Sequence, residues 1–69
     1  MRRAEPDPAA LARATGALER MPARMRRIFV ASQVDGLSFR EIARREHIAL
    51  WRVRRQMRGA IEIIDRHMR

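Results

Sequence analysis

The last third of the chain carries a long row of apolar residues at helical spacing, and this row limits the fold more than any other feature. It comprises Leu50, Val53, Met57, Ala60, Ile61, Ile64 and Met68. Because such spacings place residues on one face of a helix, we expect a helix over Leu50–Met68 with one continuous buried seam. The rest of the short chain has to cover that seam.

The opposite face of the same predicted helix is basic. It carries Trp51, Arg54, Arg55 and Arg58, with Arg52 at its border. Charged residues on an amphipathic helix are commonly a solvated face, so the pattern alone does not assign them a ligand.

Two earlier helices are predicted from their start and stop signals. Asp7-Pro8 is typical of an N-cap followed by proline in the first turn, and Pro22 ends this helix and opens the next. Asp35-Gly36 is a turn pair that stops the second helix. The expected apolar positions are Leu11, Ala14, Leu18 and Met21 in the first helix, then Met25, Ile28, Phe29 and Val34 in the second.

A third, short helix is predicted over Phe39–Glu46. Ser38 and Glu41 form a Ser-x-x-Glu capping box, and Leu37 and Ile42 occupy the positions of a hydrophobic staple. We expect this helix to bury Phe39, Ile42 and Ala43, and to expose Arg40, Arg44 and Arg45. A short helix, a brief break and a longer basic helix form the helix-turn-helix pattern, whose second helix enters the major groove of DNA. The predicted fold is therefore all-α, a three- to four-helix bundle.

Size and composition narrow the function. With 69 residues we expect one domain over 8–69, preceded by a flexible basic N-terminus over 1–7. The absence of cysteine and the presence of only two histidines argue against a zinc site, and no pattern of catalytic groups or of a cofactor site occurs, so we expect no metal, no cofactor and no enzyme. We find no apolar run that could span a membrane and no signal peptide, and we expect a soluble, cytoplasmic protein.

The charge balance points to a polyanionic partner. Sixteen arginines and no lysine face eight acids, which gives a formal net charge of +8. Arginine suits phosphates and guanine edges, although an acidic protein or a membrane surface would also attract this charge. Of the arginines before the turn, we expect Arg24, Arg26 and Arg27 to form a solvated face.

From Met21 to about Asp65 the chain resembles region 4 of bacterial RNA polymerase sigma factors, especially the extracytoplasmic-function type. The resemblance is carried by MPARMRRIFVASQVDGLSFREIARR and, less closely, by HIALWRVRRQMRGAIEIID. It implies a fold of the winged-helix-like DNA-binding superfamily without a wing. It also implies binding to the −35 element of double-stranded promoter DNA and to the β-subunit flap of the RNA polymerase core, with an anti-sigma factor as a further partner.

The resemblance also implies roles for individual residues. Arg54, Arg55 and Arg58 correspond to the main base- and phosphate-contacting positions, and Arg40 to a backbone-phosphate contact. Leu50, Trp51 and Arg52 correspond to the leading edge of the recognition helix. The side chain of Trp51 is expected either on the DNA or folded back onto the first helix.

Three positions depart from the family pattern. His47 replaces a turn glycine, Ala49 replaces the serine or threonine that caps the recognition helix, and Gly59 replaces an arginine found in several relatives. The stretch has no counterpart of the promoter-melting domain, so we expect either an excised domain or a free-standing relative that anchors at a −35 site without opening the promoter.

Two alternatives remain at the level of sequence. One is the output domain of another bacterial regulator, which shares much of the segment Asp35–Ala43 and usually dimerises through its last helix. The other is a sigma mimic that binds an anti-sigma factor rather than DNA. Whether the chain is a DNA-binding sigma domain or a sigma mimic, the numerous apolar residues of the first two helices predict a surface for a protein partner.

Overall fold

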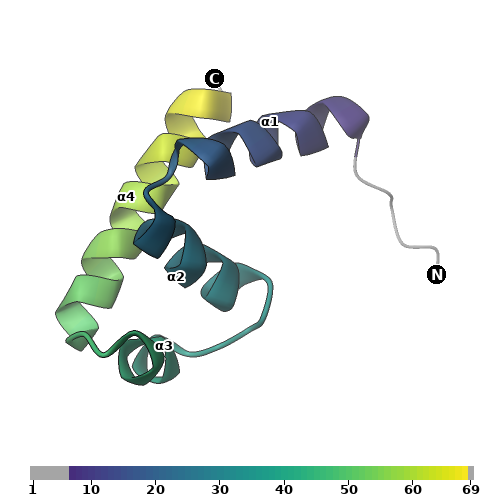
Figure 1. Ribbon diagram of the computed structural model, residues 1–69. Coiled ribbons are helices and arrows are strands. Elements are labelled where there is room, and N and C mark those ends of the chain that lie inside the picture. Colours follow the sequence, from purple (N-terminus) through teal and green to yellow (C-terminus); the bar gives the residue numbers. More distant parts are fainter. Residues whose placement is uncertain (1–6, 69) are drawn as a thin grey trace.

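Four helices make up the secondary structure of the chain in a computed structural model that describes residues 7–68. They are α1 (Pro8–Arg20), α2 (Ala23–Gln33), α3 (Phe39–Glu46) and α4 (Leu50–Met68) (Figure 1). No strand occurs among residues 7–68, so the all-α prediction is confirmed. The bounds predicted for the third and fourth helices, 39–46 and 50–68, are those that the structure shows. The predicted N-terminal segment falls, except for Asp7, outside the described residues.

The helix starts and stops use the predicted local chemistry. The side chain of Asp7 accepts a hydrogen bond from the backbone N–H of Ala9, 3.4 Å away, at the start of α1. The capping box of α3 is complete: Ser38 Oγ accepts from the N–H of Glu41 at 3.1 Å, and Glu41 Oε1 accepts from the N–H of Ser38 at 3.0 Å. Gly36 takes a φ of 70° in the turn after α2, a conformation in which glycine lacks the steric cost of a side chain.

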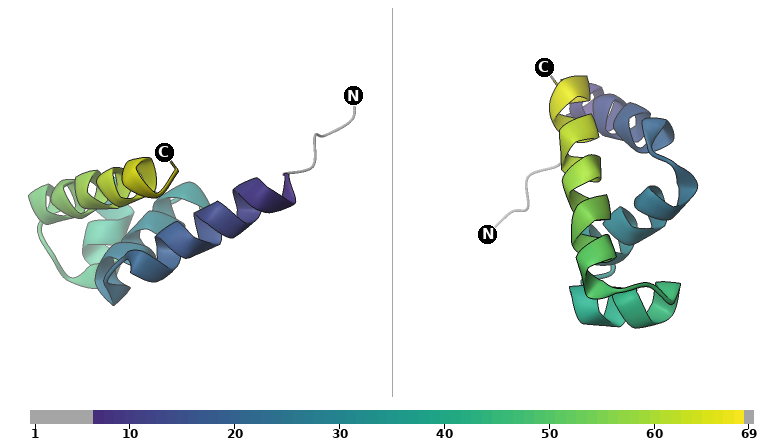
Figure 2. Two further views of the ribbon diagram at one scale, coloured as in Figure 1. Left: turned by 90° about the horizontal axis from the view of Figure 1, so that it is seen from above. Right: turned by 90° about the vertical axis from the view of Figure 1, so that its left-hand side faces the viewer.

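Helix α4 is the element on which the other three helices pack. It contacts α1, α2 and α3, and α2 also contacts α3. Two further views show α3 crossing one end of α4, with α1 lying at its other end and α2 between them (Figure 2). The break between α3 and α4 is three residues long. Together α3 and α4 form the predicted helix-turn-helix.

The core lies where α2, α3 and α4 meet. Ile28, Ile42 and Val53 have no exposed surface, and Ala31 and Met57 complete the cluster. Phe39 and Ala43, which were predicted to be buried, are half-buried and pack against this cluster. A second buried set consists of Ala17 of α1, Met21 at the C-cap of α1, and Ala60 of α4.

The predicted seam of α4 is not continuous, because Ile61 is 56% exposed and Met68 is 41% exposed. Each residue of a helix is turned by about 100° from the one before it. Ile61 directly follows the buried Ala60, so its side chain points to one flank. Helix α1 lies along another flank, where a Cβ added to Gly16 would be 2.6 Å from His67 Nε2. The side of Ile61 is therefore left uncovered.

Three further apolar residues, Leu11, Ala14 and Val34, were wrongly assigned to buried faces and are exposed. Leu11 is 50% exposed, because it lies in the first half of α1, where the described residues are mostly exposed. Val34 is 73% exposed, because α2 ends at Gln33 and the chain turns away at that point. The surface of α1 and α2 thus retains exposed apolar side chains.

Candidate nucleic-acid interface

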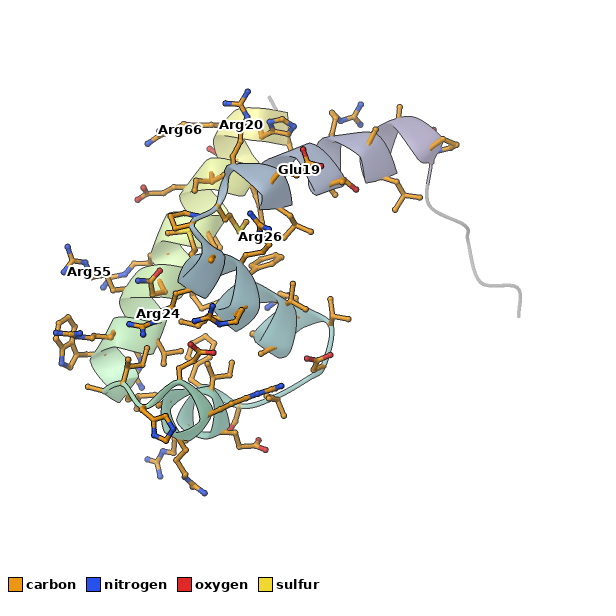
Figure 3. All side chains as sticks on the ribbon, viewed as in Figure 1. Glu19, Arg20, Arg24, Arg26, Arg55 and Arg66 are labelled. Atoms are coloured by element: carbon orange, nitrogen blue, oxygen red, sulfur yellow. The ribbon has the colours of Figure 1, made fainter. Side chains whose placement is uncertain are left out.

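The N-terminal half of α4 presents an exposed basic surface. Trp51, Arg54, Arg55 and Arg58, which we call the arginine face, are all exposed, and the indole of Trp51 is 55% exposed. At about 100° per residue their side chains fall within one arc of the helix, opposite the buried Val53. Figure 3 shows Arg55 pointing away from the rest of the bundle. The side chains thus lie where a ligand could reach them.

Arg52 lies at the border of the arginine face and contacts its neighbour Trp51. Its guanidinium carbon is 5.3 Å from the centroid of the Trp51 ring, within the range of a cation–π interaction. The indole is therefore at the surface beside Arg52. Of the two positions expected for Trp51, burial against the first helix is wrong.

The arginines of this surface are not engaged within the protein. Within the part of the chain that the structure describes, Arg40, Arg54, Arg55 and Arg58 make no hydrogen bond or ion pair. Arg40 is exposed on α3, the first helix of the pair. Four guanidinium groups therefore keep their full capacity to donate to phosphate oxygens or base edges.

A groove of about 450 Å³ borders the arginine face. Its lining combines Arg54 and Arg58 with the apolar side chains of Phe39, Met57 and Ile61, and with Gln33 at the end of α2. The sequence did not indicate Gln33, since its position beside α4 depends on how α2 packs. The groove adds apolar surface and one amide to the cationic groups.

The turn before α4 contains two of the three departures from the family pattern. His47 adopts the left-handed conformation, with φ 56° and ψ 43°, at the end of α3. Ala49 occupies the N-cap position of α4, since its carbonyl accepts from the N–H of Arg52 at 3.0 Å and of Val53 at 3.3 Å. An alanine side chain offers no acceptor to the free N–H groups of the first turn.

The third departure, Gly59, lies under a core side chain. It is half-buried, and a Cβ added to it would come within 2.7 Å of Met25 Cε. The glycine therefore leaves room for Met25 of α2 to pack against α4. A long side chain here would have to displace the end of Met25.

Arg24, Arg26 and Arg27 of α2 are all exposed, as expected of a solvated face, but they also bind other parts of the chain. Arg26 donates to the carbonyl oxygens of Leu18 at 2.9 Å and Met21 at 3.2 Å, and so ties α2 to the end of α1. Figure 3 shows Arg26 between these two helices. Arg27 donates to both carboxylate oxygens of Glu46 on α3, at 3.2 and 3.0 Å.

These contacts shift the acid–base equilibria of the groups involved. The hydrogen bond from Arg27 lowers the pKa of Glu46, and the same contact raises the pKa of Arg27. Hydrogen bonds from the backbone and hydroxyl of Ser38 lower the pKa of Glu41. Both carboxylates are thus ionised at neutral pH, and Glu46 neutralises part of the positive charge of α2.

Residues 7–68 hold neither a metal-binding cluster nor a membrane-spanning helix. These residues contain no group of three or more histidine, cysteine or acidic side chains that could hold a metal ion. None of the helices within them is long and apolar enough to cross a membrane. The exposed arginine face remains the strongest candidate for a functional surface.

The chain matches a known protein family. The family described as Sigma-70, region 4 matches residues 11–62, about three quarters of the chain. The match includes all of α2 and α3 and the whole arginine face. No curated protein and no solved structure matches the chain.

Proposed function

Because the chain belongs to the sigma-70 region 4 family of DNA-binding transcription domains, we propose that it reads the −35 element of a bacterial promoter in double-stranded form. In this proposal residues 8–69 act as one domain in transcription initiation. The domain supplies binding and no catalysis.

One observation carries the proposal: six arginines on the two helices of a helix-turn-helix make no hydrogen bond, ion pair or ring contact in the described part of the chain, and four of them, Arg40, Arg54, Arg55 and Arg58, are at positions that can meet DNA. Three of them, Arg54, Arg55 and Arg58, are on the N-terminal half of α4. In such motifs the N-terminal residues of the second helix contact base edges, and the first helix crosses the backbone. Arg40, on α3, then contacts a phosphate.

Each side chain has a role that follows from its chemistry. A guanidinium can donate two parallel hydrogen bonds to guanine O6 and N7, so we assign base contacts to Arg54 and Arg58 beside the groove. Arg55 points outward from α4 and fits a phosphate. Trp51, held by Arg52, presents an apolar ring to a thymine methyl or a sugar.

The test compares duplexes. A preferred duplex is first selected from a random pool, and fluorescence anisotropy then measures the affinity for it and for a scrambled duplex over a range of salt concentrations. If the four arginines displace about four counterions, the slope of log affinity against log salt is about −3.6. Arg54→Ala should cost about 1–3 kcal/mol on the preferred duplex and relax the preference.

Two matched variants separate the roles. Arg40→Ala should weaken binding to both duplexes alike, as expected for a phosphate contact. Arg13→Ala removes the same charge from the exposed surface of α1, away from the arginine face, and should change both affinities little. Binding that does not depend on salt, or an unchanged preference in Arg54→Ala, would refute the proposal.

We further propose that the domain docks on a protein, the β-subunit flap of RNA polymerase or an anti-sigma factor. The support is the apolar surface left on the first two helices, where Leu11 is 50% exposed and Val34 is 73% exposed. Chemical-shift mapping with a flap-tip peptide should move the signals of α1 or α2. Shifts confined to α4 would count against this surface.

The two alternatives predict different results in the same assays. A regulator output domain that pairs through α4 would sediment as a tight dimer. A sigma mimic would bind an anti-sigma factor but show no salt-dependent affinity for any duplex. The unengaged arginines favour the DNA-binding function over the mimic, because a protein partner alone does not require guanidinium groups at base-reading positions.

A further inference from the structure

Glu46 is an acid in a position where the pattern of α3 calls for an apolar residue. The inward side of α3 carries Phe39, Ile42 and Ala43, and Glu46 continues this row at spacings of three and four. Its side chain is only 12% exposed. A carboxylate so placed is costly unless it is paired, which raises the question of what it does.

The pairing of Glu46 is specific in direction. Arg27 donates from Nε to Oε2 at 3.2 Å and from Nη2 to Oε1 at 3.0 Å, and Arg24 Nε lies 3.8 Å from Oε1. Two parallel hydrogen bonds fix the angle between donor and acceptor as well as their distance. Among residues 7–68, the side-chain hydrogen bonds that join α2 to α3 all end on this carboxylate.

The packing of α2 on α3 is incomplete at this end. A pocket of about 290 Å³ that opens to solvent lies beside the pair. It is lined by the apolar Val30, Ala31 and Ile42 and by the charged Arg26, Arg27, Asp35, Arg45 and Glu46. Ile42, with no exposed surface, anchors the middle of α3. Without the ion pair, the C-terminal end of α3 would border a partly empty space and could move about this anchor.

Because Glu46 lies close to α4 in the sequence, the angle between α2 and α3 can affect where α4 lies. Glu46 is the last residue of α3, and α4 begins at Leu50 after a three-residue turn. From these observations we infer that Glu46, held by Arg27, is a positioning residue that fixes the end of α3 and thereby the way α4 meets DNA. The effect on DNA binding rests on the proposed function, whereas the effect on the orientation of α3 does not.

The first experiment needs no DNA. Backbone N–H residual dipolar couplings report the direction of α3 relative to α2 in the full chain in solution. Glu46→Gln, which retains the shape but loses the charge, should change the couplings of α3 while those of α1 stay as they are. Glu19→Gln is the matched control, since it removes the same charge from an exposed site on α1. Unchanged couplings in Glu46→Gln would overturn the inference.

The second experiment measures discrimination, which loss of stability alone would not change when all the protein is folded. We expect Glu46→Gln to lower the ratio of affinities for preferred and scrambled duplexes about tenfold, equivalent to about 1.4 kcal/mol. Glu19→Gln should leave the ratio unchanged. A ratio that stays at the wild-type value in folded Glu46→Gln would refute the role in positioning α4.

A third variant guards against unfolding of Glu46→Gln. Glu46 is 12% exposed and continues the apolar row of α3, whereas Arg27 is 57% exposed, so the ion pair is only partly buried. Apolar side chains can replace such a pair without leaving a buried charge unpaired, so the double variant Arg27→Met with Glu46→Leu should fold. It should still show altered couplings and reduced discrimination, whereas wild-type values in both would overturn the inference. If the wild-type chain shows no duplex preference at all, the proposed function fails, and the couplings alone decide the role of Glu46.

Discussion

Replacing His47 with glycine should stabilise the chain, because His47 holds a backbone conformation that suits glycine. It is the one non-glycine residue between 7 and 68 with a positive φ, at φ 56° and ψ 43°. The left-handed conformation costs an L-residue about 1–2 kcal/mol, and helices commonly end in a glycine with this geometry. The backbone N–H of His47 donates to the carbonyls of Ala43 and Arg44, and glycine would keep both hydrogen bonds.

The gain is reduced by the unfolded chain. Glycine has more freedom when unfolded, which offsets about 0.4–1 kcal/mol. The net stabilisation is therefore about 1 kcal/mol, and in a domain of this size that corresponds to a rise in melting temperature of about 4–8 °C. The imidazole is exposed and makes no hydrogen bond in the described part of the chain, so little is lost with it.

Thermal unfolding followed by circular dichroism measures the effect. His47→Ala is the control, because it removes the imidazole but keeps a Cβ in the left-handed conformation, and it should not raise the melting temperature. If His47→Ala and His47→Gly stabilised the chain equally, the imidazole rather than backbone strain would be responsible. If neither did, the strain argument for this turn would be wrong.

Three further changes test the local chemistry of the helix-turn-helix. Ala49→Ser supplies the missing N-cap acceptor of α4 and should stabilise the fold by about 0.5–2 kcal/mol. It should also tighten duplex binding, as measured by fluorescence anisotropy. If only the melting temperature rises, the cap affects folding alone. Ser38→Ala removes the acceptor for the N–H of Glu41 and should lower the unfolding free energy from urea titration by about 0.5–2 kcal/mol, so an unchanged midpoint would argue against the capping box. The pKa values of Glu41 and Glu46 are lowered in the folded chain from the ordinary 4.5. The stability that these two carboxylates contribute is therefore complete above about pH 5 and is lost as the pH falls through their pKa values in the folded chain. Melting curves from pH 7 to pH 3 should show this loss of stability, and the loss should be smaller in Glu46→Gln.

The ends of the helices could be predicted from sequence because they depend on neighbouring residues. The capping box is a contact between Ser38 and Glu41, three positions apart, and its two hydrogen bonds form as the sequence indicates. The same holds for Asp7 and Gly36. None of these contacts requires knowledge of how the helices pack, so the predicted starts and stops are confirmed.

Burial was harder to predict, because it depends on which flank a neighbouring helix covers. Ala17 and Ala31 are buried although the apolar pattern did not single them out, since small side chains let two helices approach closely. Ile61 is apolar and exposed for the opposite reason, as α1 covers another flank of α4. Periodicity defines a face of a helix but does not show how much of it finds a partner.

The arginines could be counted from the sequence but not sorted by role. Arg26 and Arg27 look like Arg54 and Arg55 in a helical pattern, yet the first two bind a helix end and a carboxylate, and the last two bind nothing in the described part of the chain. The partner of Arg27 is 19 residues away. Only the packing of α2 on α3 brings that partner within reach.

This sorting of charge bears on how DNA would approach. The attraction of a basic chain for DNA is not sequence-specific, and a uniformly basic surface would bind a duplex in many orientations. Here Glu46 and the carbonyls at the end of α1 occupy guanidinium groups of α2, and most of the unengaged ones lie on α3 and the first half of α4, with Arg13 and Arg20 on α1 as the others in the described part of the chain. The second half of α4 carries the exposed acids Glu62 and Asp65 and one exposed arginine, Arg66, whose Nη2 lies 4.0 Å from Glu62 Oε2, so this half adds no net positive charge in the described part of the chain. Attraction is therefore strongest at the N-terminal end of α4 and weaker toward its C-terminal end, which would orient the domain before any base contact forms.

Reversing the charge of Glu62 should then speed association with both duplexes while lowering the discrimination between them. Stopped-flow fluorescence that found an unchanged association rate would contradict this account.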